Sequence, residues 1–222
     1  MLTRTKACFR KIPAWIEAVV VLFLAFGMAA ISGSTHASDD FEFSNTLMIG
    51  LVVQQVLIAS VCVAILYLRG WKFWKNFPFN WNLKHGALSV GLYAASIVGY
   101  VILYNIAVLA VGLDALRSPR LTVTANVGLV VLVSLVNPMF EEMFVVYYLY
   151  ERLKKYGPLL FISASAVLRV SYHLYQGWLG VISLLPFGVL CALAFWKTRN
   201  LMPLYVAHVI GDLLGLLAAP DH

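Results

Sequence analysis

Apolar residues gather in seven long segments that are separated by short polar connections. A helix needs about 20 residues to cross the roughly 30 Å hydrocarbon core of a bilayer, and each segment approaches or exceeds that length. The segment at 122–150 is longer than one crossing requires, so we expect Pro138 to kink it or its first residues to lie at the membrane interface. The pattern predicts transmembrane helices at residues 13–32, 45–68, 87–113, 122–150, 158–176, 179–196 and 200–218.

The composition supports this interpretation. Of the 222 residues, 62% are hydrophobic and only 12% are charged, whereas about a quarter of the residues in a soluble domain carry charge. The three cysteines have neither a paired spacing nor a metal-binding motif. The chain is therefore expected to be an all-α polytopic membrane protein with about seven transmembrane helices.

The positions of the basic residues predict an orientation. Lysine and arginine are concentrated in cytoplasmic loops of membrane proteins, and 13 of the 16 lysines and arginines fall at one predicted membrane face. Only Arg117 and Arg120 fall at the other, where the first loop is acidic (Asp39, Asp40 and Glu42). This places the N-terminus in the cytoplasm and the C-terminus on the opposite side, and the net charge of +6 needs no nucleic-acid partner. The 13 residues are Arg4, Lys6, Arg10, Lys11, Arg69, Lys72, Lys75, Lys84, Arg152, Lys154, Lys155, Lys197 and Arg199.

The first apolar segment raises the question of a cleavable signal. Basic residues, an apolar run and Thr35-His36-Ala37 loosely resemble one. The apolar run is long for a signal peptide, so we expect this segment to remain as a span.

Several ionisable residues lie inside the predicted spans of the C-terminal half. Glu141 and Glu142 are adjacent in a long apolar stretch, although one charge at the bilayer centre costs at least ~2.5–3.5 kcal/mol. Residues four apart share one face of a helix. Arg169 with His173, and His208 with Asp212, have this spacing, and Asn137 lies one turn before Glu141. We expect the polar faces of three helices to converge on one interior cavity.

A carboxylate and two histidines around a buried cavity can activate water. The carboxylate would act as general base, and the imidazoles would orient the water or donate to a developing oxyanion. No serine or cysteine lies in a nucleophile motif such as GxSxG. The same residues could hold a divalent metal, but no HExxH motif makes this specific. A metal cofactor is therefore possible but not favoured.

Three motifs carry a resemblance to a known family. The Glu141-Glu142 pair, the sequence RVSYHLYQG from Arg169, and His208-x-x-x-Asp212 after NLMPL follow one another on separate predicted spans. In this order they resemble the CPBP intramembrane proteases, which include the type II CAAX prenyl endopeptidases and bacterial bacteriocin-processing or immunity proteins. The resemblance covers about residues 124–217. It implies N-terminal transmembrane helices and loops at 1–120 and a protease core at 121–218, within one integral membrane unit.

The resemblance also implies roles for the site residues. It makes the chain a glutamate-dependent endopeptidase whose active site lies in the C-terminal helical bundle. Glu141 would activate water, His173 would help hold it, and His208 with Asp212 would line the oxyanion side. Glu142 would belong to the catalytic set, with Arg169 and Asn137 in supporting positions. The expected partners are the lipid bilayer and a membrane-associated peptide or protein substrate.

The chain departs from the family pattern EExxxR, FxxxH and HxxxN or HxxxD at two positions. Val146 stands where the first motif has arginine, and Arg169 stands where the second has phenylalanine. We hypothesise that Arg169, from the neighbouring helix, pairs with Glu142. The third motif ends in Asp212 rather than asparagine. An ionised aspartate cannot donate a hydrogen bond to an oxyanion, so Asp212 is expected to orient His208.

Other polar residues have simpler explanations. Tyr147, Tyr172 and Tyr175 are expected to be packing or interfacial aromatics, and Glu17 is expected to lie at the interface near the end of the first span.

Other function classes remain open at this point. A non-catalytic immunity or scaffold protein would bind a peptide without cleaving it. A metal-dependent hydrolase would use the same residues as ligands. A proton-coupled transporter also places carboxylates and histidines at mid-membrane, but the sequence shows no internal repeat.

Overall fold

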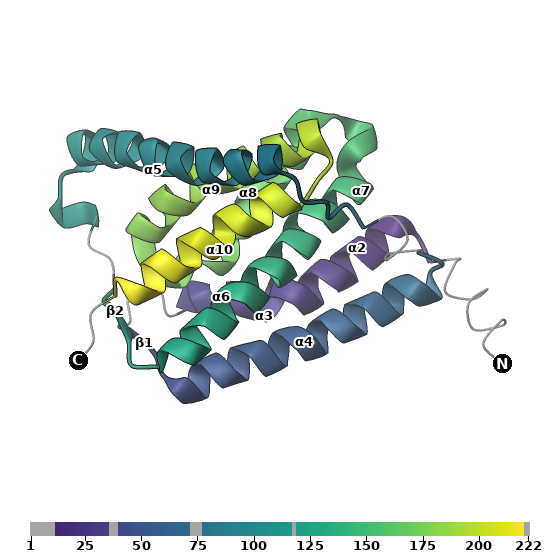
Figure 1. Cartoon of the computed structure of the whole chain (residues 1–222), viewed down its shortest axis with the longest axis horizontal. Helices are drawn as coiled ribbons and strands as arrows, with labels where there is room; N and C mark the ends of the chain where they lie inside the picture. Colours follow the sequence, from purple (N-terminus) through teal and green to yellow (C-terminus); the bar gives the residue numbers. More distant parts are fainter. Residues whose placement is uncertain (1–11, 36–39, 72–76, 117–118, 220–222) are drawn as a thin grey trace.

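The computed structural model describes residues 12–35, 40–71, 77–116 and 119–219, and almost all of its regular structure is helical (Figure 1). Predictions that concern Arg4, Lys6, Arg10, Lys11, His36, Ala37, Asp39, Lys72, Lys75 and Arg117 fall outside these residues. The helices are α2 (Ala14–Leu22), α3 (Met28–Thr35), α4 (Asn45–Leu68), α5 (Leu83–Val111), α6 (Val127–Glu141), α7 (Leu149–Leu153), α8 (Pro158–Tyr172), α9 (Gly177–Thr198) and α10 (Met202–Leu217). The π-helical segments are η1 (Phe23–Gly27) and η4 (Glu142–Tyr148), and the 3-10 turns are η3 (Asp114–Leu116), η5 (Lys154–Tyr156) and η6 (Leu174–Gln176).

Polar residues define where the long helices begin. Ser44, Asn82 and Asn126 precede α4, α5 and α6, and each side-chain oxygen accepts a hydrogen bond from a backbone N–H in the first turn. Such a cap satisfies one of the N–H groups that have no partner within a helix. Helices α8 and α10 instead have proline at the first or second helical position. The N–H that proline lacks would have no partner there, so its absence costs nothing.

Among the described residues, five helical stretches are long and apolar enough to cross a membrane, namely 14–32, 45–68, 83–111, 127–156 and 174–198. Many large apolar side chains of α4 and α5 are exposed, among them Leu109 at 87%, as expected for surfaces that face lipid rather than water. The chain is therefore a polytopic helical membrane protein. Helices α8 and α10 are shorter apolar helices, so the count of seven spans stays a prediction.

Two predicted segments have different bounds in the structure. The segment at 122–150 does not begin as a helix, because residues 121–123 form strand β2 and Asn126 caps α6. Pro138 lies inside α6, and the helix widens into η4 only after Glu141. The segment at 158–176 ends early, because His173 leaves the helical conformation (φ −108°, ψ 11°).

A short parallel sheet joins the starts of two helices. Strand β1 (Phe41–Phe43) pairs with β2 (Leu121–Val123), so that Glu42 lies opposite Thr122. Asp40, the residue before β1, accepts a hydrogen bond from the Arg120 backbone N–H. Helices α4 and α6 leave this sheet side by side and contact each other (Figure 1).

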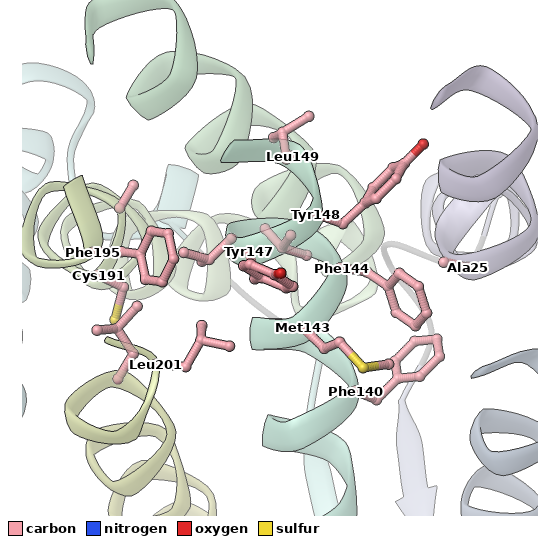
Figure 2. Close-up of a cluster of buried hydrophobic side chains, with 14 of the residues drawn as sticks. Ala25, Phe140, Met143, Phe144, Tyr147, Tyr148, Leu149, Cys191, Phe195 and Leu201 are labelled. Atoms are coloured by element: carbon pink, nitrogen blue, oxygen red, sulfur yellow. The ribbon is translucent and has the colours of Figure 1, made fainter. Parts of the chain in front are cut away.

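The core of the bundle surrounds η4. All seven η4 side chains are buried, and they point to opposite sides of the segment (Figure 2). Tyr147 faces Phe195 on α9, whereas Phe144 lies on the side of α2 and η1 (Figure 2). The helical stretch 127–156 is accordingly the most buried of the five candidate spans. It therefore carries Glu141 and Glu142 through the centre of the molecule.

Buried ion pairs tie the connections together at the other end of the bundle. Glu17, which is only 3% exposed, accepts hydrogen bonds from Arg69, Arg152 and the Tyr148 hydroxyl. Glu17 therefore lies in a buried ion cluster that joins α2 to the ends of α4 and α7, and its position at the membrane interface stays a prediction. At the same end Asn200 contacts His85, so three connections with basic residues among those described, α4–α5, α7–α8 and α9–α10, lie together.

Candidate active site

Glu141 and Glu142 lie where α6 passes into the π-helical segment η4. Their side chains are 4% and 1% exposed. A π-helical turn contains more residues than an α-helical one, and such turns are frequent at functional sites. The two carboxylates are therefore held at a change of helical geometry in the centre of the bundle.

Arg169 on α8 bridges the two carboxylates. Its Nη1 lies 3.2 Å from Glu141 Oε2, and its Nη2 lies 2.7 Å from Glu142 Oε1. The predicted Glu142–Arg169 pair is confirmed as a contact, and the second bond to Glu141 was not expected from the sequence. Because a buried carboxylate needs a counter-charge, Arg169 makes it possible for both glutamates to lie in an apolar bundle.

The surroundings of Arg169 fit a buried guanidinium. Its Cζ lies 5.3 Å from the centre of the Phe187 ring. A Cβ atom at position 188 would lie 3.3 Å from Arg169 Cδ, so Gly188 leaves the space that the side chain occupies. Glu142 Oε2 and Arg169 Nε are buried without a hydrogen-bond partner among the described residues. Val146, which stands where the family motif has arginine, is fully buried.

Tyr172 completes the hydrogen bonding of Glu141. Its hydroxyl donates to Glu141 Oε2 at 2.6 Å, and its ring stacks on Phe26 of η1 at a centroid distance of 4.5 Å. Tyr172, which is expected from the sequence to be a packing or interfacial aromatic, therefore also binds a carboxylate of the site. The first candidate span thereby contributes to the site, because Phe26 fixes the ring that carries the hydroxyl.

His173 lies just beyond the end of α8 and faces the other oxygen of Glu141. Its Nδ1 lies 3.0 Å from the Arg169 carbonyl oxygen. A carbonyl only accepts, so Nδ1 carries the proton, and Nε2 of the neutral ring is an acceptor. Nε2 lies 3.8 Å from Glu141 Oε1, too far for a direct hydrogen bond. Arg169 and His173, which are expected to share one helical face, thus both approach Glu141.

His208 on α10 approaches the pair from the opposite side. Its Nδ1 lies 2.8 Å from Glu142 Oε1, and its Nε2 lies 3.4 Å from Asp212 Oδ1 and 3.9 Å from Glu141 Oε2. Its ring packs edge-on against Phe187 at 5.1 Å. Both nitrogens of the imidazole therefore face carboxylates from the same cluster.

A chain of amide side chains extends from Asp212 to α4. Asn137 Nδ2 donates to Asp212 Oδ2 at 3.2 Å, and Gln55 Nε2 donates to Asn137 Oδ1 at 2.6 Å. Because Asn137 Oδ1 accepts from Gln55, Nδ2 is the end of the Asn137 amide that faces Asp212. Asp212 is 22% exposed, so it is the most open carboxylate of the cluster.

The structure brings all seven residues singled out from the sequence into one cluster, namely Glu141, Glu142, Arg169, His173, His208, Asp212 and Asn137. Two further contacts were not predicted from the sequence: the Tyr172 hydroxyl on Glu141, and Gln55 on Asn137. A signal for Gln55 was present, because two adjacent glutamines interrupt the apolar segment at 45–68.

The cluster side chains pack against one another. Two described pockets lie elsewhere, one near Gln176 and Ser183 and the other near Tyr147 and Arg199. Within the ranges that the structure describes, no three His, Cys, Asp or Glu residues are arranged to hold a metal ion. Two carboxylates of this cluster contact Arg169, and the cluster also includes two imidazoles, an arrangement suited to moving protons.

Comparison with known proteins agrees with this geometry. No curated protein and no solved structure matches the chain. The family model "Type II CAAX prenyl endopeptidase Rce1-like" matches residues 123–214, a region that runs from β2 through α10 and includes the three motifs. The chain is therefore similar over residues 123–214 to the Rce1-like type II CAAX prenyl endopeptidases, in agreement with its resemblance to the CPBP intramembrane proteases.

Proposed function

We propose that this protein is an intramembrane endopeptidase in which Glu141 activates water to hydrolyse a peptide bond. The observation that carries the proposal is the arrangement of Glu141. One of its oxygens is fixed by Arg169 and Tyr172, whereas the other faces His173 without a direct bond. Similarity to a protease family over residues 123–214 supports the same reaction class.

The separation of Glu141 Oε1 and His173 Nε2 suits a bridging water. Atoms 3.8 Å apart can both lie within hydrogen-bond distance of one water molecule. Both atoms accept, so the water would donate one hydrogen to each and present its oxygen lone pair to a peptide carbonyl. Glu141 would take the first proton as general base, and His173 would fix the direction of attack.

His208 would stabilise the oxyanion that forms on the peptide carbonyl. Its Nδ1 is directed at Glu142, which leaves Nε2 to face the reacting group. Because Nδ1 donates to the Glu142 carboxylate, Nε2 can donate to an oxyanion only when both ring nitrogens carry a proton. Glu142 and Asp212 lie at the two nitrogens, so each of those protons has an acceptor before substrate binds. Asp212 would thus orient His208 rather than contact the oxyanion.

The substrate is proposed to be a membrane-associated peptide or protein. The name of the matching family points first to prenylated CAAX peptides. A pair of synthetic peptides of one CAAX sequence, with and without the prenyl group, would decide whether this chain needs the lipid group.

The experiment that tests the proposal compares membranes containing the wild-type chain with membranes containing Glu141→Gln, using peptide mass spectrometry. We expect wild-type membranes to produce cleaved peptides that are absent with Glu141→Gln, and uncleaved substrate to co-purify with the variant.

Chelators should leave cleavage unchanged, and a loss of activity with chelators would favour the metal-dependent alternative. If Glu141→Ala still supports the cellular phenotype, a non-catalytic scaffold or immunity role would replace the protease.

We also propose that the connections near Arg152 and Arg199 face the cytoplasm, with the N-terminus on that side and the C-terminus opposite. The support is the clustering of basic connections at one end of the bundle. In a chain with Cys8 changed to serine, Lys155→Cys should react with an impermeant thiol reagent only from the cytoplasmic side, and Leu113→Cys only from the other. The reverse labelling pattern would contradict the orientation.

A further inference from the structure

A pocket of about 370 Å³ opens at the end of the bundle where the basic connections lie. Its lining includes three aromatic residues and three charged ones, from η4, α7, η5, α9 and the connection that follows α9. None of them belongs to the Glu141 cluster, so the pocket is separate from the proposed active site. The six residues are Tyr147, Tyr150, Glu151, Lys154, Phe195 and Arg199.

Arg199 has an unusual backbone at the mouth of this pocket. It is the non-glycine residue with positive φ among those described (φ 53°, ψ 34°), and it forms the C-cap of α9. Glycine is the usual residue in this left-handed conformation, because a Cβ atom is unfavourable there. A strained backbone of this kind is often associated with a functional side chain.

The Arg199 side chain is preorganised by stacking. Its Cζ lies 4.1 Å from the centre of the Tyr150 ring and 4.5 Å from that of Trp196. No described residue accepts a hydrogen bond from its guanidinium. A planar guanidinium that is held on aromatic faces, with its N–H groups available, fits the two oxygens of a phosphate or carboxylate.

The remaining charges of the pocket favour an anion. Lys154 donates to both oxygens of Glu151, so this carboxylate is already paired and Arg199 supplies the net positive charge of the lining. Further basic side chains lie nearby along the chain, among them the exposed Lys155 and Lys197. The lining of the pocket is thus positively charged.

The position of the pocket selects a lipid among possible anions. Helix α8 follows Lys154 after a short turn and exposes Leu159 at 79% and Leu160 at 48%. Such surfaces face acyl chains, and aromatic and basic residues around them lie at the level of lipid headgroups. Basic pockets between helix ends at this level bind anionic headgroups. We propose that the Arg199 pocket binds the headgroup phosphate of an anionic phospholipid.

The test uses the full-length protein reconstituted in vesicles of equimolar phosphatidylcholine and phosphatidylglycerol. The lipids that remain bound after mild detergent extraction would be counted by native mass spectrometry. Wild type should retain phosphatidylglycerol preferentially, and Arg199→Gly should lose it roughly 10-fold, as expected for a charge-assisted hydrogen-bonded pair. Glycine is favoured at this backbone position, so the variant should keep the α9 cap and its thermal stability.

Two matched variants distinguish the pocket from the general charge of the surface. Lys197→Ala removes one positive charge from the last turn of the same helix without changing the lining, and it should affect retention much less than Arg199→Gly. Tyr150→Leu removes the stacking and should lower retention while Arg199 remains. Equal losses from Lys197→Ala and Arg199→Gly would overturn the proposal.

The other sources of an anion give different results. If inorganic phosphate alone raises the melting temperature of detergent-solubilised wild type but not of Arg199→Gly, and phosphatidylglycerol does not, the ligand is a free phosphate. If Arg199→Gly raises KM for a peptide substrate but leaves lipid retention unchanged, the pocket binds a peptide carboxylate. Either result would overturn the assignment to a lipid.

Discussion

Arg169 Nη2 lies 2.7 Å from Glu142 Oε1, although the two residues come from different helices and Arg169 stands where the family motif has phenylalanine. The family pattern places the arginine at the position of Val146, in the same helix as the glutamates. In this chain the positive charge comes from α8 and reaches both glutamates. The bridge therefore couples the position of α8, and with it Tyr172 and His173, to the two carboxylates.

The Glu142–Arg169 pair should be energetically coupled. Removing one partner of a buried ion pair costs about 3–5 kcal/mol because the other charge is left unpaired. The double variant Glu142→Gln/Arg169→Gln should therefore be less destabilised than the sum of the single variants, by about 0.5–3 kcal/mol. Unfolding of the four proteins in mixed detergent micelles measures this, with Glu142→Gln/Lys154→Gln as the distant control pair. Additive effects for the first pair would show that the bridge is not a stabilising unit.

Moving the arginine to the family position should restore part of the activity. Arg169→Phe alone should inactivate the protein, because two buried carboxylates lose their counter-charge. Adding Val146→Arg should recover cleavage, since Glu142 Oε2 has no partner among the described residues and position 146 lies about one turn away. Val145 is equally buried, so Val145→Arg is the control. Equal recovery from both positions, or from neither, would contradict a specific relocation of the charge.

Much of this arrangement follows from local sequence patterns, and the rest depends on contacts between distant residues. Long apolar runs predict the helices, and i, i+4 spacing predicts that His208 and Asp212 approach each other, because both effects act within one helix. The β1–β2 pairing was not predicted, since three residues such as Phe41–Phe43 carry too little signal for a strand. The π-helical turn after Glu141 and the Gln55–Asn137 contact are set by packing between helices, which spacing along one segment does not encode.

The hydroxyl of Tyr172 should contribute to the chemistry rather than to substrate binding. A hydrogen bond to a charged group is worth about 1.5–3 kcal/mol, so Tyr172→Phe should lower kcat by roughly 10- to 100-fold with little change in KM. Kinetics on the substrate identified by the membrane comparison would measure this. Tyr175→Phe is the control, because that hydroxyl accepts from Gln176 and does not contact Glu141. A rise in KM at constant kcat would assign Tyr172 to substrate binding instead.

Gln55 should act as a positioning residue through Asn137 and Asp212. Gln55→Leu removes one neutral hydrogen bond, which is worth about 1 kcal/mol, and should therefore lower kcat about 5-fold. The midpoint of unfolding should change little, because Gln55 is only partly buried. Gln54→Leu changes the exposed neighbouring glutamine and should leave kcat unchanged. Equal effects from both substitutions would indicate a general effect on α4 rather than the loss of the hydrogen bonds that join Gln55, Asn137 and Asp212.

Glu17 should stabilise the bundle from the end opposite the β1–β2 sheet. Its carboxylate accepts from Arg69 and Arg152 in a buried position, so Glu17→Gln removes the negative charge that both guanidinium groups contact. We expect a loss of about 3–5 kcal/mol in the free energy of unfolding, as for other buried pairs that lose one partner. Glu151→Gln is the matched control, because its partner Lys154 is 46% exposed and such surface pairs contribute about 0–1 kcal/mol. Unfolding in mixed micelles compares the two variants.

Because Tyr148 links this cluster to η4, Glu17→Gln should also make η4 amides exchange faster with deuterium than Glu151→Gln does. Equal stability and equal exchange in the two variants would show that the cluster does not hold α2 against the rest of the bundle.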